Sequence, residues 1–87
     1  MSVPLSIVLK VLRKALNHTV LVKLKDGSEY IGVLESFDHT MNLILKDAKE
    51  VKSGNVDDPI AKYGTVMVRG SNILYVVVDF DYSSLRI

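Results

Sequence analysis

The fold is decided around one short polar stretch, Asp38-His39-Thr40-Met41-Asn42. It separates two apolar, strand-like runs at residues 30–37 and 43–45. Asp and Asn side chains bond readily to nearby backbone and tolerate turn geometry. Taken alone, the stretch therefore predicts a turn between two strands.

A second polar signal, Arg69-Gly70-Ser71-Asn72, lies at the junction of two later strand-like runs. An Asn amide can read the edge of a base, Arg offers a flat cationic face, and Gly lets a backbone come close. The two signals together favour a ligand pocket built from Asn42, Arg69 and Gly70. The alternative is that both stretches are only turns.

The remaining residues predict one helix and five strands. Pro4 suits a first helical position, and apolar residues then recur at helical spacing over residues 4–16. Asn17 is a suitable terminator because Asn accepts the left-handed conformation. Strands are expected at residues 19–25, 28–37, 41–45 with an extension as far as residue 51, 65–69 and 73–78.

Two glycines shape the first strands. Asp26-Gly27 is a strong signal for a two-residue hairpin loop. Gly32 interrupts the second strand, where a glycine usually marks a bend or a close backbone approach. A long strand with a central glycine can curve far enough to serve both halves of a small barrel.

Charged residues gather in two places. The helix carries Lys10, Arg13 and Lys14, which form either a solvated face or a basic surface that touches RNA or a partner. Residues 46–62 are rich in charge and turn formers and predict a long hairpin connection with a solvated tip. Residues 79–87 form a short tail for which the sequence predicts no helix or strand.

Composition limits the possible functions. The chain has 87 residues and suits one domain with a modest core. The absence of Cys excludes disulfides, Cys-ligated zinc and thiol nucleophiles, and two His residues predict neither a metal site nor a cofactor. A net charge of +1 gives no general support to nucleic-acid binding, so a chain of this charge that binds RNA must concentrate its positive charge locally. With no signal peptide and no run of ~20 apolar residues, we expect a cytoplasmic protein that does not enter a membrane.

The last strand, residues 73–78, is apolar on both faces. Such a strand requires burial on both sides, and an exposed apolar edge invites aggregation. Pairing with a strand of a neighbouring copy satisfies both requirements. A head-to-tail contact of this kind closes into a ring when the rotation permits.

These features together resemble the Sm and Sm-like (LSm) family over residues 5–78. The first family motif resembles residues 32–43 within a region at 18–48, and the second resembles residues 66–73 within a region at 63–78; the loop at 47–62 is variable. The resemblance implies a mostly β single domain: an N-terminal helix stacked on a strongly bent, five-stranded antiparallel sheet, a small open SH3-like barrel.

The resemblance also implies a function. Family members form rings, usually of seven copies and in the bacterial branch of six, that bind uridine-rich single-stranded RNA at the pore rim. The second motif is similar to the archaeal and eukaryotic pattern, and an archaeal-type chain would form a homo-oligomeric ring. Roles in RNA processing, turnover or ribonucleoprotein assembly follow, with other RNA-processing proteins as further partners.

Residue roles follow from the matched motifs. Asn42 matches the residue that hydrogen-bonds the uracil edge, and Arg69 matches the residue that stacks on the base. Asp38 matches the acidic residue that holds the binding loop by hydrogen bonds. Met41 and Gly70 match positions that shape the two loops.

Two positions depart from the family pattern. Many members have His or an aromatic residue directly before Met-Asn, stacking on the other face of the base; this chain has Thr40 there, with His39 one residue earlier. Either residue is a candidate for contact with the base. Many members also have Asp after Arg-Gly, where this chain has Ser71, which can hydrogen-bond but brings no charge.

Three alternatives compete with RNA binding. An enzyme is disfavoured because Asp38 and His39 are adjacent, rarely face each other, and have no nucleophile or metal set beside them. A scaffold ring could bind proteins through the basic helix face and residues 46–62, with little affinity for RNA. A monomeric SH3-like barrel is the third alternative.

Overall fold

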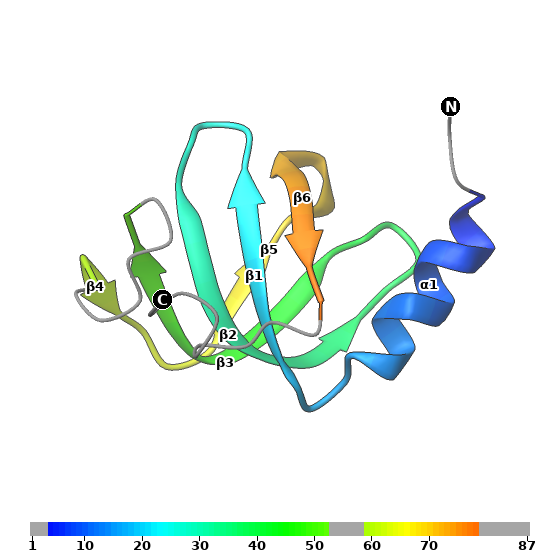
Figure 1. The fold of residues 1–87 in the computed structure, drawn as a ribbon, viewed down its shortest axis with the longest axis horizontal. Helices are drawn as coiled ribbons and strands as arrows, with labels where there is room; N and C mark the ends of the chain where they lie inside the picture. Colours follow the sequence, from blue (N-terminus) through cyan, green and yellow to red (C-terminus); the bar gives the residue numbers. More distant parts are fainter. Residues whose placement is uncertain (1–3, 53–58, 79–87) are drawn as a thin grey trace, which may run out of the picture.

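The computed structural model describes residues 4–52 and 59–78, and it shows one helix beside a bent antiparallel sheet (Figure 1). The strands lie in the order β4-β3-β2-β1-β6, and β5 pairs with β3 off this path. The elements are α1 (Leu5–Lys14), β1 (Thr19–Leu24), β2 (Glu29–Phe37), β3 (Leu43–Val51), β4 (Ala61–Lys62), β5 (Val66–Val68), the 3₁₀ turn η1 (Gly70–Asn72) and β6 (Ile73–Val77). The predicted helix and bent sheet are confirmed, with the short β4 added to the five expected strands.

Helix α1 contacts the sheet through its last turns. Leu12 and Ala15 are buried in the core, whereas Leu5 is 50% exposed, so the helix projects from the sheet at its start (Figure 1). The helix ends at Lys14, and Asn17 has a φ of 66°, which confirms it as the left-handed residue of the termination. With ten residues in α1, no described helix is long and apolar enough to cross a membrane.

The predicted hairpin between β1 and β2 is confirmed, but its loop covers residues 25–28 rather than two residues. A two-residue type I′ loop requires positive φ at both central positions. Gly27 alone in this loop has a positive φ, 95°. The Leu24 carbonyl accepts the Gly27 N–H at 3.0 Å, and the Ser28 carbonyl accepts the Leu24 N–H at 2.9 Å, which closes the longer loop.

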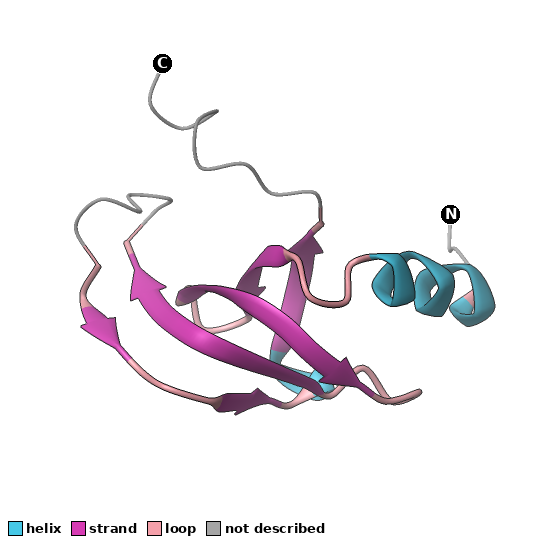
Figure 2. Ribbon diagram, turned by 90° about the horizontal axis from the view of Figure 1, so that it is seen from below, coloured by secondary structure: helices cyan, strands magenta, loops and turns pink. Residues whose placement is uncertain are grey.

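Gly32 is a point of close approach, as predicted. A Cβ placed there would lie 3.1 Å from the Leu45 Cβ, 3.1 Å from the Lys46 carbonyl oxygen and 3.2 Å from the Ala48 Cα. The β2–β3 register shifts at the same point, between Ile31 and Val33. This crossing allows β2 and β3 to arch together, as the two longest strands do in Figure 2.

The connection is shorter than the expected residues 46–62, because the expected extension of the third strand to residue 51 is confirmed and β4 begins at Ala61. Strand β3 starts at Leu43, not residue 41, and continues to Val51, with Ala48 and Val51 both buried. Strand β4 then returns along β3, pairing Ala61 with Glu50. The loop tip at residues 53–58 and the tail at 79–87 lie outside the described residues.

The packing of the core and the pairing of the strands determine which surfaces and strand edges stay exposed. One cluster of buried residues joins α1 to the sheet: Leu12, Ala15, Val20, Val22, Leu34, Leu43, Leu45, Ala48 and Val68. Over the described residues, β5 pairs only with β3 and β6 only with β1, so each has a free edge. On β6, Val76 packs on the core, whereas Leu74, Tyr75 and Val77 are exposed.

Candidate nucleic-acid interface

The polar stretch between β2 and β3 forms a tight turn, as predicted. The Asp38 carbonyl accepts the Met41 N–H at 3.0 Å, and the Asp38 N–H donates to the Asn42 carbonyl at 3.1 Å. Met41 has a φ of 68°, a left-handed conformation that non-glycine residues seldom adopt. Its half-buried side chain packs on the core, which holds the turn against the body of the protein.

The carboxylate of Asp38 organises this turn. Its Oδ1 accepts the Thr40 N–H at 2.9 Å, the Thr40 hydroxyl at 2.7 Å and the Asn42 N–H at 3.0 Å. Its Oδ2 accepts the Asn42 Nδ2–H at 2.9 Å. The hydroxyl of Thr40, followed by the amide of Asn42, lowers the pKa of Asp38 to about 2. The group is therefore ionised at neutral pH, where a charged acceptor makes these bonds stronger.

Asn42 joins the two polar signals. Its Oδ1 accepts the backbone N–H of Gly70 at 2.8 Å, across the gap between the 38–42 turn and η1. Its Nδ2 donates to Asp38 Oδ2 and to Thr40 Oγ1, both at 2.9 Å. The expectation that the two signals lie together thus holds for Asn42 and Gly70.

Gly70 is needed for this junction. A Cβ at Gly70 would clash with the Thr40 carbonyl oxygen and lie 2.9 Å from the Met41 carbonyl carbon. The backbone that comes close is therefore the protein's own second loop. Sequence alone had allowed a ligand in that place.

Arg69 is exposed and lies directly before this junction. It lines a hollow with Leu24, Tyr30, Tyr63, Met67 and Asn72, whereas Asn42 lines a smaller hollow that shares Met67 with it. The rings of Tyr30 and Tyr63 lie 6.1 Å apart at 46°, and the hydrogen bond that Tyr63 donates to Glu50 raises the pKa of Tyr63. These two aromatic residues were missed because residues 30 and 63 meet only after the sheet has formed.

The other candidates lie around the two loops or on the helix. His39 and Ser71 are exposed, and so is Thr40, although its hydroxyl is bonded to Asp38 and Asn42. Lys10, Arg13 and Lys14 line a separate hollow on α1 with Ile7 and Val11.

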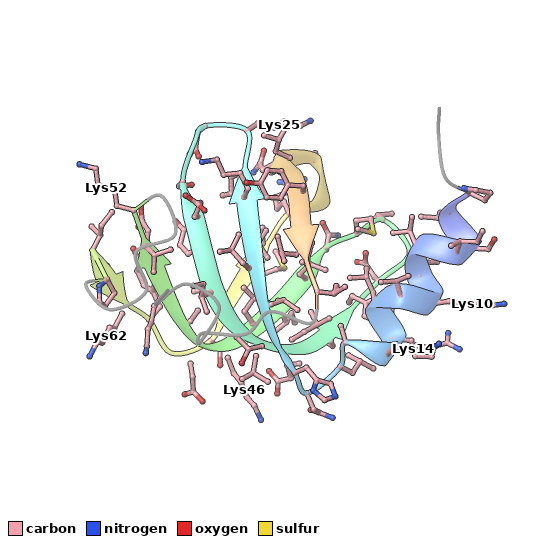
Figure 3. The ribbon with its side chains drawn as sticks, in the orientation of Figure 1. Lys10, Lys14, Lys25, Lys46, Lys52 and Lys62 are labelled. Atoms are coloured by element: carbon pink, nitrogen blue, oxygen red, sulfur yellow. The ribbon has the colours of Figure 1, made fainter. Side chains whose placement is uncertain are left out.

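Positive charge is spread over the molecule. Figure 3 shows the side chains of Lys10 and Lys14 pointing away from the sheet, with Lys25, Lys46, Lys52 and Lys62 distributed along the rest of the periphery. No group of His, Asp or Glu in residues 4–52 and 59–78 is arranged to hold a metal ion. The lysines labelled there therefore do not gather on one face of the described residues.

Comparison with known proteins gives a consistent result. The family model described as the LSM domain matches residues 10–78. An Sm-like protein of Methanococcoides burtonii is 44% identical over 68 residues, which cover 78% of this chain and 90% of that protein.

Two solved structures share the fold. The Sm protein of Pyrococcus abyssii in complex with a uridine heptamer has a TM-score of 0.73 at 36% identity and covers 80% of this chain and 94% of its own. A heptameric archaeal Sm protein has a TM-score of 0.69 at 43% identity and covers 79% and 96%.

Proposed function

Because this chain belongs to the LSM-domain (Sm-like) family, we propose that it assembles into a homo-oligomeric ring that binds uridine-rich single-stranded RNA at the rim of its pore. Seven copies are favoured, since related archaeal chains form heptamers, and six is the alternative. The uridine heptamer bound by the Pyrococcus abyssii protein indicates the class of RNA. Processing, turnover or ribonucleoprotein assembly is the proposed setting.

One observation supports this proposal most strongly: the Asn42 amide lies between Asp38 and the Gly70 backbone N–H. An amide held in this way presents its carbonyl oxygen to a base edge in a fixed position, while the neighbouring Arg69 offers an exposed planar cation. Unstacked bases of single-stranded RNA are suited to both contacts. Stacking on such a surface contributes about 1–3 kcal/mol per base.

The free edges of β5 and β6 support the ring. One edge of each strand lacks a backbone partner among the described residues, and Met67 on β5 and Leu74 on β6 are 65% and 58% exposed. Pairing β5 of one copy with β6 of the next would satisfy these backbone groups and bury both apolar surfaces. A closed ring would also repeat Arg69 around its axis, giving the local charge that a single copy lacks.

Native mass spectrometry with and without a seven-nucleotide oligo(U) tests the proposal. We expect a ring mass at micromolar concentration and a shift by one oligonucleotide in its presence. A monomer mass would contradict the ring and favour the monomeric SH3-like barrel. A ring that binds no oligo(U) would favour the scaffold function, for which exposed Leu5, Ile7 and Val11 beside the basic residues of α1 offer a protein-binding surface.

Two single substitutions locate the RNA site. Arg69→Ala should weaken oligo(U) binding, leave the ring intact and reduce the salt dependence, because one cation per subunit is lost from the site. Lys10→Ala removes the same charge from α1 and serves as the matched control, with affinity close to that of the parent. Fluorescence titrations at two salt concentrations measure both effects. The opposite ranking would move the site to the helix face with Arg13 and Lys14.

A further inference from the structure

In the structure both N–H donors of the Asn42 side chain are already engaged. One hydrogen is donated to Asp38 Oδ2 and the other to Thr40 Oγ1, each at 2.9 Å. The carbonyl oxygen accepts the Gly70 N–H at 2.8 Å and keeps one further lone pair. The amide cannot be turned over, since the carboxylate requires its NH₂ group and the backbone N–H requires its oxygen.

This arrangement limits what Asn42 can read. Uracil presents N3–H beside the carbonyl oxygen O4, so an amide with a free oxygen and a free N–H pairs with both. Cytosine presents the reverse, an acceptor at N3 beside an amino group. With its second hydrogen held by Thr40, Asn42 offers only an acceptor, and either the uracil N3–H or the cytosine amino group can donate to it.

The geometry around Thr40 shows why its hydroxyl takes this hydrogen. The hydroxyl donates its own hydrogen to Asp38 Oδ1 at 2.7 Å, so its lone pairs are left for Asn42. The Thr40 backbone N–H donates to the same carboxylate oxygen at 2.9 Å. Two bonds to one ionised group therefore fix the residue, although its side chain is exposed.

Resting on the proposed function, we propose that Thr40 determines base specificity: its hydroxyl occupies the Asn42 hydrogen that would otherwise bind uracil O4. The preference for uridine over cytidine is therefore smaller than it would be in a ring whose Asn42 kept this hydrogen free. Thr40 acts through Asn42 and is a positioning residue.

Thr40→Val and Thr40→Ser separate the hydroxyl from the shape of the side chain. Valine keeps the branched form and the backbone bond to Asp38 but lacks the hydroxyl, whereas serine keeps the hydroxyl. Full-length parent and variants are titrated with seven-nucleotide oligo(U) and oligo(C) at one salt concentration. We expect Thr40→Val to raise the Kd ratio of oligo(C) to oligo(U) by about threefold or more, the effect of one hydrogen bond, and Thr40→Ser to keep the ratio of the parent.

An unchanged ratio in Thr40→Val, or an equal rise in Thr40→Ser, would overturn the role of the hydroxyl while leaving RNA binding in place. A parent that binds neither oligonucleotide would instead overturn the proposed function. If Thr40→Val does not assemble, hydrogen exchange of the parent tests the hydrogen bond between Asn42 and Thr40 directly. Both Asn42 side-chain hydrogens should then exchange slowly, and fast exchange of the hydrogen assigned to Thr40 would refute the inference.

Discussion

At the scale of single residues, the ionised carboxylate of Asp38 decides whether residues 38–42 have one conformation. Four donors converge on its two oxygens at 2.7–3.0 Å, from Thr40 and Asn42. Protonation would remove the charge and occupy one acceptor position. The turn would then lose the group that also orients the amide of Asn42.

The first prediction concerns pH. The folded-state pKa of Asp38 is about 2, below the usual 3.8, because donors from Thr40 and Asn42 favour the ionised form. The stabilisation from these bonds is fully present above pH 3.8 and is lost as the pH falls through about 2. The amide proton shifts of Thr40 and Asn42, followed by NMR, should therefore change with a midpoint near pH 2.

Asp38→Asn supplies the control for that titration. The same amide signals should show no transition in this window, because the variant has no proton to gain at residue 38. A midpoint near the ordinary value of 3.8 in the parent would mean that the hydrogen bonds are not formed in solution.

The turn at residues 26–28 shows which of the hydrogen bonds around Asp38 and Asn42 could be predicted from sequence. There the Asp26 Oδ1 accepts the Ser28 N–H at 2.9 Å and the Ser28 hydroxyl at 2.6 Å, the arrangement that Asp38 makes with Thr40. The shared Asp-x-Ser/Thr pattern predicts these bonds from sequence. The Asn42–Gly70 bond spans 28 residues and depends on how the sheet folds, so no local pattern indicates it.

At the scale of elements, the contact between η1 and the 38–42 turn depends on a missing side chain. A Cβ at Gly70 would clash with the Thr40 carbonyl oxygen and crowd Met41. Backbone on both sides leaves little room for adjustment. This contact positions Asn42 beside the segment that carries Arg69.

We predict that Gly70→Ala destabilises the protein by about 1–3 kcal/mol, the usual effect of overpacking a tight site. Gly64→Ala is the matched control, because a Cβ at Gly64 meets nothing within 4 Å. Urea unfolding of both variants and the parent at one protein concentration measures the difference. Equal midpoints for the two variants would show that the loops separate freely.

The strands show where sequence patterns stop being sufficient. The alternation in residues 19–25 and the glycine at residue 32 predict β1 and the crossing of β2 correctly. The second half of β3 carries exposed Lys46 and Asp47, and its composition favours a loop. Pairing with β2 and β4 makes it a strand, because tertiary context outweighs weak local strand preference.

At the scale of the whole molecule, the surface that matters most is the pair of open sheet edges. Exposed Tyr75 and Val77 lie along β6, whereas Val76 between them packs on the core. Tyr75 and Val77 therefore point outward, away from the chain's own core. Substitution at either position should affect assembly more than folding.

Val77→Lys should therefore break the ring while leaving the fold of each copy intact, because a charge would be placed in the apolar contact between subunits. Ile60→Lys introduces the same charge at a residue that is 61% exposed and lies before β4, outside β5 and β6. Analytical ultracentrifugation and circular dichroism measure mass and fold. A Val77→Lys ring of parental mass would place the subunit contact elsewhere.

The two open edges belong to different strands, so one can be blocked without the other, and this has a genetic consequence. A copy blocked only at β6 still offers β5, so it can cap a growing chain of normal copies. Such a subunit would join an incomplete ring and prevent it from closing, which is more damaging than failing to join. Because every ring needs all of its contacts, a minority of edge-blocked copies would remove a disproportionate share of complete rings, and the defect would be dominant over the parent protein in the same cell.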